Sequence, residues 1–337
     1  MAKATSKLKS KPSLKPTVSS KPTRNAAAKA SSRAGENPPT KRSKPASRAN
    51  NVATNPLATN RPGYGSFAAI PPDVRERLSN ARESSRTLSE LLAIDFAAYL
   101  RAIEPRLSLD GAHAVQNAGG IIKKLIEASR VVREEIGDPA IQTFAQHPTD
   151  LARGIAAYMM GHSAMQQADL SQSKPGQSHA RHAIDRVLHD VWALADDAHS
   201  GVREWAWMGI RPVLALDIEH TIRAFDPWIH HQSPNIRRFA SEATRPRGVW
   251  CTHIALLRTD PSLGLPLLEP LRADTTKYVQ DSVSNWLNDA SKDDANFVRG
   301  VAQRWTEQAD ALDTAGDTPK AKSLRRVVTR ALRTVGE

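Results

Sequence analysis

The sequence predicts an all-α protein, a solenoid in which helix pairs stack on one another as an α-α superhelix. Three related segments recur along the chain and begin at Asp196, Ser233 and Asp274. Sustained alternation of apolar and polar residues, the pattern of half-buried strands, is missing from the sequence, and so are hairpin turns between apolar runs. These observations favour helical repeats over any architecture that contains a sheet.

Each of the three segments has a cluster of turn-forming polar residues, then a β-branched anchor, then a small or apolar residue four places on. The anchors and their partners are Val202 with Ala206, Ile236 with Ala240, and Val279 with Val283. The anchors are 34 and 43 residues apart, which fits stacked helix–turn–helix units. Such a unit cannot bury its apolar face alone, so neighbouring units are expected to stack.

Upstream of the repeats, apolar residues at helical spacing predict a helix over 88–103. Thr87 is its expected N-cap, with Glu90 at the capping-box spacing. A second helix is expected over 110–137, where the pair Gly119–Gly120 can interrupt it.

Further along the chain, helices are expected over 151–167 and 182–195, with a loop at 171–178 between them. A short helix over 263–271 should pack in the second layer of a repeat. The stretch 307–321 is polar and rich in turn-forming residues, and the last helix, over 319–335, is basic on one face.

The positive charge of the chain is unevenly placed. The net charge is +12, yet residues 1–61 hold 14 basic residues and one acid, Glu36, so the rest of the chain has 33 basic and 34 acidic residues. Residues 1–61 contain too few large apolar residues to form a core, and we expect a disordered tail followed by one folded domain over 62–337. The tail can either condense on nucleic-acid phosphates or act only as a solubilising segment.

Several classes of protein are disfavoured. The single cysteine, Cys251, cannot form an internal disulfide, and no run of about 18 apolar residues predicts a membrane span. Phosphate-binding loops and the H-E-x-x-H motif are absent from the sequence. Cys251 and His253 alone are a weak metal signal, so neither a metal nor a cofactor is expected.

Three carboxylates attract attention because they lie in apolar or aromatic surroundings, near the same part of each repeat. They are Glu204, Glu242 and Asp289. Equivalent positions of stacked repeats line one face, so these acids can converge on one patch with nearby tryptophans. The alternative is that each acid caps a helix or pairs with an arginine one turn away.

Two segments resemble a known family. Residues 241–250 read S-E-A-T-R-P-R-G-V-W, and residues 278–293 read Y-V-Q-D-S-V-S-N-W-L-N-D-A-S-K-D. Together they resemble the AlkC branch of the DNA-alkylation-repair glycosylases, relatives of AlkD that are built from HEAT-like repeats, over roughly residues 185–305. The resemblance implies an N-glycosylase that excises cationic N-alkylated bases from DNA in base-excision repair, namely 3-methyladenine and in addition 3-methylcytosine or 1-methyladenine.

The resemblance also implies a set of catalytic residues. Glu204, which precedes I-R-P at 210–212, and Glu242, Trp250 and Asp289 match the functional positions of the family. The sequence departs from the family pattern at Ala243, Gly248–Val249, Gln280 and Trp286. These departures bear on DNA affinity and lesion preference more than on catalysis, and Trp286 is expected to shift the preference among cationic lesions.

The chemistry implied for this site needs no general acid, because a base methylated at a ring nitrogen leaves as a neutral molecule. Asp289 is expected to stabilise the oxocarbenium-like sugar, with Glu204 and Glu242 completing an anionic patch. Trp250 would face the cation. The residues expected to hold flanking phosphates are Arg237, Arg238, Arg245, Arg247, Lys277 and Lys292.

The expected partner is therefore double-stranded DNA with alkylated bases, bound by a monomer in the cytoplasm at the bacterial nucleoid. Two other functions fit the same sequence. One is a non-catalytic HEAT-repeat scaffold that binds protein, which the fold alone would allow. The other is a nucleoid-associated protein whose basic tail does the binding.

Overall fold

The computed structural model describes residues 61–169 and 178–335. All of the described residues belong to one compact unit. The expected disordered tail, apart from its last residue, and the expected loop at 171–178, apart from Ser178, lie outside the described residues. Within the described ranges every regular element is an α-helix or a 3₁₀-helix, so the all-α prediction is confirmed.

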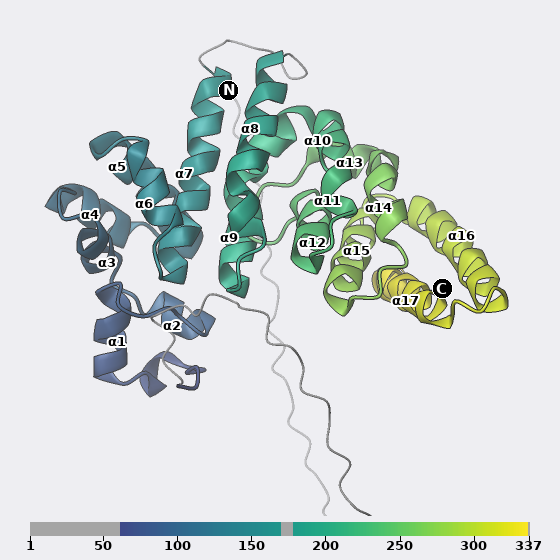
Figure 1. Ribbon diagram of the computed structural model, residues 1–337, viewed down its shortest axis with the longest axis horizontal. Helices are drawn as coiled ribbons and strands as arrows, with labels where there is room; N and C mark the ends of the chain where they lie inside the picture. Colours follow the sequence, from purple (N-terminus) through teal and green to yellow (C-terminus); the bar gives the residue numbers. More distant parts are fainter. Residues whose placement is uncertain (1–60, 170–177, 336–337) are drawn as a thin grey trace, which may run out of the picture. The chain divides into compact units, whose positions relative to one another are not determined.

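The helices of the repeats form two rows. The first row is α7 (Asp150–Asp169), α9 (Ser200–Leu214), α12 (Pro234–Ala243), α15 (Lys277–Ala290) and α17 (Thr318–Ala331). The second row is α8 (Ser178–Ala195), α10 (Ile218–Ala224), α11 (Asp226–Ile229), α13 (Ala255–Thr259), α14 (Leu265–Leu271) and α16 (Ala295–Thr314). Each first-row helix packs on the next, and they follow one another in chain order (Figure 1). The prediction of stacked helix pairs is confirmed.

Before the repeats come six helices: α1 (Pro72–Ser79), α2 (Leu88–Leu92), α3 (Phe96–Ile103), α4 (Leu109–Asn117), α5 (Ile121–Glu135) and α6 (Pro139–Ala145). Short 3₁₀ segments occupy Phe67–Ala69, Ala215–Asp217, Pro261–Gly264 and Leu332–Thr334. The expected break at Gly119–Gly120 is confirmed, since α4 ends before these residues and α5 begins after them.

The single helix predicted over 88–103 is wrong. Thr87 does cap a helix, with its side chain accepting from the backbone N–H of Glu90, but α2 ends at Leu92. Asp95 then caps α3 by accepting from the N–H of Ala98. Periodicity alone did not reveal the break, because the apolar residues on both sides keep the helical spacing.

The turn-rich reading of 307–321 is also wrong for its first half. Helix α16 continues to Thr314, with Trp305 and Ala309 buried on its packed face. Only a short connection remains before Asp317, which caps α17 by accepting from the N–H of Lys320. The helical pattern of these residues is weak in the sequence, and packing against α17 stabilises the helix.

The β-branched anchors have the expected role. Val202, Ile236 and Val279 are fully buried near the starts of α9, α12 and α15. Their burial stabilises the stacking of the repeats, by about 25 cal/mol for each Å² of apolar surface removed from water.

The residue after each anchor forms a ladder that joins neighbouring repeats. Arg203 donates to the carbonyls of the preceding loop, and Arg237 does the same to His231 and Gln232 at 2.8 Å each. Arg237 also pairs with Asp274 of the next loop at 2.6 Å. In the last unit Gln280 replaces the arginine and still donates to a loop carbonyl, that of Asp274, at 2.8 Å. Arg153 on α7 has the same pattern, with Asp197 as its acid at 2.6 Å.

Helices α7 and α9 approach each other very closely. A Cβ atom on Gly161 would lie 2.0 Å from the carbonyl oxygen of Gly209, so both positions require glycine. This contact fixes α9, which carries several site residues.

At the N-terminal end of the described residues, Arg61 pairs with Glu83 at 2.5 Å and with Glu90 at 2.7 Å, so the fold includes the last residue assigned to the tail. None of the helices in the described ranges is long and apolar enough to cross a membrane.

Candidate functional site

A pocket of about 420 Å³ opens beside α9. Glu204 and Trp207 come from α9, Glu242 from the end of α12, and Val249 and Trp250 from the loop after it. The opposite wall comes from the N-terminal helices. Its residues are Ser85, Arg86, Thr87, Leu88, Leu91, Ile121 and Ile122. The pocket is thus mostly apolar and aromatic, with carboxylates on one side, which is the usual composition of a small-ligand site.

A buried arginine fixes the loop that carries Trp250. Arg211 is 2% exposed and donates to the carbonyls of Ala243 at 2.6 Å, of Thr252 at 3.1 Å and of Arg245. Burial lowers the pKa of Arg211. Because its hydrogen bonds reach both ends of residues 243–252, Arg211 holds this loop against α9.

The same loop has an uncommon backbone at Trp250. Its φ is +70°, in the left-handed region that bulky residues seldom adopt, and the residue is 63% exposed. Gly248 allows the tight turn before it, since a Cβ atom there would lie 2.1 Å from the sulfur of Cys251. A large exposed indole on a constrained turn at a pocket is typical of a binding surface rather than of a core.

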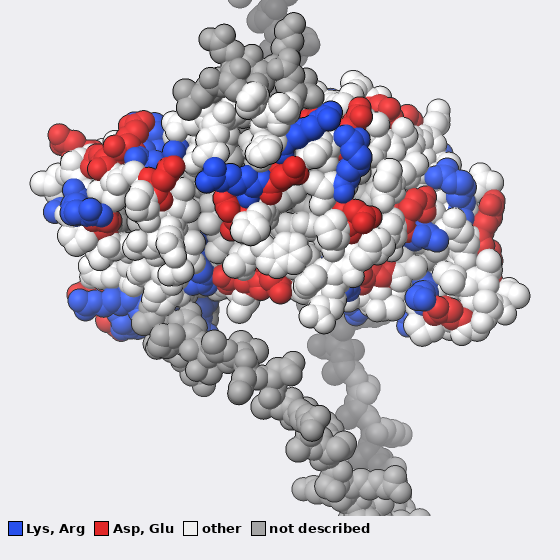
Figure 2. Space-filling view, turned by 45° about the horizontal axis from the view of Figure 1, so that its top comes forward, with Lys and Arg blue, Asp and Glu red and all other residues white. Residues whose placement is uncertain are grey.

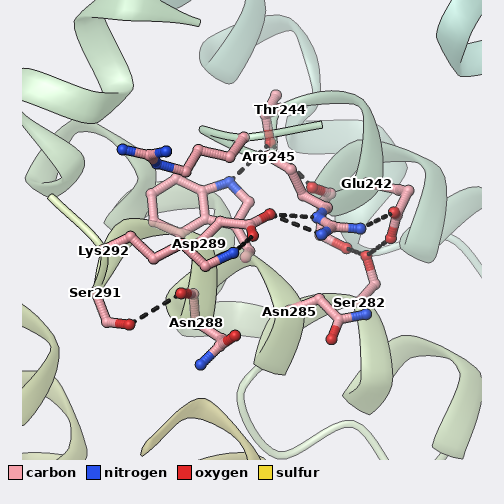
Figure 3. Close-up of polar contacts among 12 residues, drawn as sticks. Glu242, Thr244, Arg245, Ser282, Asn285, Asn288, Asp289, Ser291 and Lys292 are labelled. Carbon is pink, nitrogen blue, oxygen red and sulfur yellow. Dashed lines mark hydrogen bonds and ion pairs between the residues drawn. The ribbon is translucent and has the colours of Figure 1, made fainter. Parts of the chain in front are cut away.

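Arg245, which also lines the pocket, joins two of the predicted acids. Its Nη1 donates to Glu242 Oε1 at 2.6 Å, and its Nε lies 2.8 Å from Asp289 Oδ2 (Figure 3). Ser282 donates to the other oxygen of Glu242 at 2.7 Å, and Lys292 donates to Asp289 Oδ1 at 3.1 Å. Side chains from α12 and α15 thereby form one connected network.

The network continues to the third acid through Arg238. Its Nη2 lies 2.7 Å from Glu204 Oε1 and 3.5 Å from Glu242 Oε2. The other oxygen of Glu204 accepts from the indole Nε1 of Trp207 at 2.9 Å. We call the six charged side chains Glu204, Arg238, Glu242, Arg245, Asp289 and Lys292 the acid network.

The acid network balances three carboxylates with three cations. Burial raises the pKa of Glu242, but the charges of Arg238 and Arg245 and the hydrogen bonds from Arg245 and Ser282 outweigh it, so this pKa lies below its ordinary value. Burial acts to lower the pKa of Arg245, and Glu242 and Asp289 raise it further than burial lowers it. Both groups are therefore held in their charged forms.

The three predicted acids are brought together, but they differ in exposure. The side chain of Glu204 is 36% exposed and lines the pocket, and Glu242 lines it from a buried position. Asp289 is 3% exposed and lies behind Arg245 and Lys292 rather than on the pocket wall. Glu242 pairs with arginines one turn away, as the alternative expected. Asp289 pairs with a lysine one turn away and with an arginine of another repeat, and Glu204 pairs across repeats.

The basic residues expected to contact DNA fall into three groups. Arg238 and Arg245 belong to the acid network, and Arg237 belongs to the ladder. Arg247 pairs with Asp293 at 2.6 Å. Lys292 also belongs to the acid network, since it pairs with Asp289, and its side chain is exposed. Lys277 is exposed as well. The face in Figure 2 shows positive and negative side chains interspersed, without a broad patch of one sign.

Two tryptophans that were expected near the acids serve the core. Trp286 is fully buried, and its Nε1 donates to Thr244 Oγ1 at 3.3 Å. Trp205 is also buried, although part of it reaches the pocket. A lesion in the pocket cannot touch Trp286 in this arrangement, so the expected shift of preference has no contact to support it.

Sequence reasoning missed several residues of the site. Ser282 could have been found, since it lies seven residues before Asp289 and so on the same face of α15. Leu88 and Ile121 carried no signal, because they reach the pocket from helices more than 75 residues upstream of Glu204 by number. Among residues 61–169 and 178–335, no cluster of three or more His, Cys, Asp or Glu side chains is arranged to hold a metal ion.

Comparison with known proteins gives two similarities, and no protein-family model matches the sequence. Over 96 residues the chain is 45% identical to the uncharacterized protein YhaZ of Bacillus subtilis (strain 168), a match that covers 28% of this chain and 27% of that protein. In structure it is similar to Pseudomonas fluorescens alkylpurine DNA glycosylase AlkC bound to DNA containing an abasic site analog, with a TM-score of 0.47 and 22% identity. That similarity covers 71% of this chain and 60% of the other, so the chain spans less than two thirds of either protein.

Proposed function

We propose that this protein is a DNA glycosylase that removes cationic N-alkylated bases. One observation carries the proposal. Glu204, Glu242 and Asp289 come from three different helices and join one network beside the pocket that holds the exposed Trp250. These are the four residues for which the sequence resemblance implies a catalytic role.

The proposed reaction breaks the bond between C1′ of the deoxyribose and the base nitrogen. The bonding electrons stay with the base, which loses its positive charge and leaves neutral. The sugar becomes an oxocarbenium-like cation, which a nearby carboxylate stabilises. Water then adds to C1′, and its proton passes to a carboxylate or to solvent. A general acid for the leaving base is not required.

The position of Asp289 requires one step before it can act. In the described structure Arg245 and Lys292 cover its oxygens. Lys292 is a flexible surface side chain, 41% exposed, and a DNA phosphate competes with Asp289 for its ammonium group. We propose that Lys292 moves to a phosphate when DNA binds and frees Oδ1 of Asp289, while Arg245 keeps its contact with Oδ2.

The pocket supports a preference for cationic bases. Trp250 and Trp207 supply aromatic surface, and a cation over such a ring gains about 0.5–2 kcal/mol. Glu204 places a carboxylate at the pocket surface, where it is paired with Arg238. A neutral base such as uracil or hypoxanthine gains neither attraction and leaves as an anion next to carboxylates.

The test is release of free base by the purified full-length protein from duplexes that each hold one lesion. We expect release of 3-methyladenine, and of 3-methylcytosine or 1-methyladenine, with none from uracil or hypoxanthine duplexes. Release of uracil at a comparable rate would contradict the electrostatic basis, and no release from any methylated duplex would contradict the function itself.

A variant tests the proposed movement of Lys292. The change Lys292→Gln should weaken duplex binding, yet leave single-turnover base release at saturating protein within a few-fold, because Oδ1 of Asp289 is already free. Lys277→Gln is the control, since Lys277 is an exposed lysine at the start of α15 and has no ion pair with an acid of the described ranges. A rate as low as that of a variant without the Asp289 carboxylate would mean that Lys292 acts in the chemical step.

A second candidate function is a HEAT-repeat protein that binds DNA or protein without catalysis. It is favoured by the observation that each acid of the network is paired with a cation, as a purely structural network would be. The base-release assay separates the two functions, since a scaffold yields no free base.

A further inference from the structure

Helix α17 and the 3₁₀ turn after it carry a row of cations on one face. Lys322, Arg326 and Arg330 follow one another at four-residue spacing, and Arg333 is three residues further on. Residues three or four apart lie on the same face of a helix. We call these four residues the α17 basic row.

Few acidic side chains of the described ranges pair with the α17 basic row. Arg326 Nη2 pairs with Asp281 Oδ1 at 2.6 Å, and its Nη1 donates to the amide oxygen of Gln280 at 3.0 Å. Arg330 Nε lies 3.1 Å from the same Asp281 oxygen without the alignment of a hydrogen bond. Arg333 donates to the amide oxygen of Asn285 at 2.9 Å and to the Arg330 carbonyl at 2.8 Å. Within the described ranges, direct contacts thus give three guanidinium groups a single carboxylate.

The other side of the same helix differs. Arg325 is one residue before Arg326 and pairs with two acids of α16, Asp310 at 2.7 Å and Asp313. The excess of positive charge is therefore confined to one face. This contrast makes Arg325 a matched control for the row.

The surroundings of Arg333 agree with uncompensated positive charge. Burial lowers the pKa of Arg333, and the charge of Arg330 lowers it further, against opposing effects of Asp289 and Asp281. The pKa of Arg325, which pairs with two acids, is shifted in the opposite direction. An added anion would relieve this repulsion.

The row adjoins the acid network along α15. Asp281 and Asp289 are eight residues apart on α15, about 12 Å at the rise of an α-helix. Asn285, which accepts from Arg333, lies between them. Helices α15 and α17 pack side by side (Figure 1), so a strand with its damaged nucleotide near Asp289 can pass over the row.

We propose that the α17 basic row binds the phosphodiester backbone of duplex DNA next to the damaged nucleotide. The step from Arg326 to Arg333 is about 10 Å along the helix axis, over which one DNA strand presents about three phosphates. The choice of duplex DNA as the anion rests on the proposed function.

The test is DNA affinity as a function of salt, measured with the full-length protein so that any contribution of the 14 basic residues of 1–61 is the same in every variant. The double variant Arg330→Gln, Arg333→Gln should lower the slope of log affinity against log salt by about 1.8. Its loss of affinity relative to the wild type should then shrink about tenfold between 50 and 200 mM salt. Arg325→Gln should leave the slope unchanged.

A variant that is expected to strengthen DNA binding controls for loss of folding. Asp281→Asn removes the one carboxylate on the row and should tighten duplex binding several-fold at low salt. An unchanged slope in the folded double variant, or an equal loss in Arg325→Gln, would overturn the proposal, as would weaker binding by Asp281→Asn.

The outcomes also separate this proposal from the proposed function. If the slope falls as expected but the wild type releases no base, the row binds DNA and the glycosylase proposal fails. If base release occurs but the slope does not change, the glycosylase proposal survives and the row is not the DNA contact.

Discussion

Arg237 and Arg238 are neighbours on α12 and belong to two different systems. Arg237 points along the stack, donates to two loop carbonyls and pairs with Asp274 of the next repeat. Arg238 points into the acid network, between Glu204 and Glu242. The difference teaches that position within the repeat, rather than residue type, decides whether an arginine holds the fold or belongs to the site.

The two systems also differ in what they neutralise. The ladder joins single arginines mainly to backbone carbonyls, and Arg153 and Arg237 each pair with one acid in addition. The acid network buries several charges together, so each member depends on the others for solvation. Loss of a ladder residue should therefore affect stability alone, and loss of a network residue should affect stability or chemistry according to its place.

The largest expected effect comes from the same substitution made in both systems. Asp289→Asn should slow single-turnover base release by about 10²–10³, the usual effect of removing one electrostatic stabiliser. Asp274→Asn removes the acid of the ladder and should leave the rate at saturating protein within a few-fold. Quench assays on one duplex with 3-methyladenine measure both rates.

Each of these variants needs a folding control by circular dichroism and thermal unfolding. Equal rate losses in both variants would show that base release follows stability, and the distinction between the two systems would then fail.

Removal of the central arginine of the network should have the largest effect on stability. Arg245→Met leaves the buried carboxylates of Glu242 and Asp289 without their shared partner. Breaking a buried pair in this way costs about 3–5 kcal/mol. Urea denaturation gives the free energy of unfolding, and a loss below about 1 kcal/mol would show that the network is not needed for the fold.

A smaller loss of unfolding free energy is expected for Arg237→Gln. Glutamine already takes this place at Gln280, where it donates to the Asp274 carbonyl. The variant keeps one hydrogen bond to the preceding loop and loses the ion pair, so we expect a loss of about 1–3 kcal/mol. Duplex affinity should not change, and a drop in the salt slope would show that Arg237 contacts DNA as first predicted.

The smallest expected effect is the pH dependence of the free energy of unfolding. Although burial raises the pKa of Glu242, its cationic neighbours bring the folded-state value below the ordinary 4.5. The ionised side chain therefore stabilises the fold above pH 4.5, and this contribution is lost as the pH falls through the lower folded-state pKa. The difference in unfolding free energy between wild type and Glu242→Gln should shrink as the pH is lowered from 6 through this window. A constant difference would mean that the charge of Glu242 does not contribute.

The fold class, the anchors of the repeats and the local pairs could be predicted from the sequence. Val202, Ile236 and Val279 could be identified because helical repeats need a buried residue at a fixed place in each unit. The pairs of Arg238 with Glu242 and of Lys292 with Asp289 follow from one-turn spacing on a helix. The break at Ile94 was missed, because periodicity continues through it.

Only the tertiary structure decided which charges meet and which are covered. Arg245 reaches Asp289 across 44 positions, and Arg238 reaches Glu204 across 34. The pocket gains its second wall from Leu88 and Ile121, and the Trp250 loop gains its support from Arg211. Such contacts depend on how far one helix is displaced and turned relative to the next, and residue spacing within each helix does not specify that geometry.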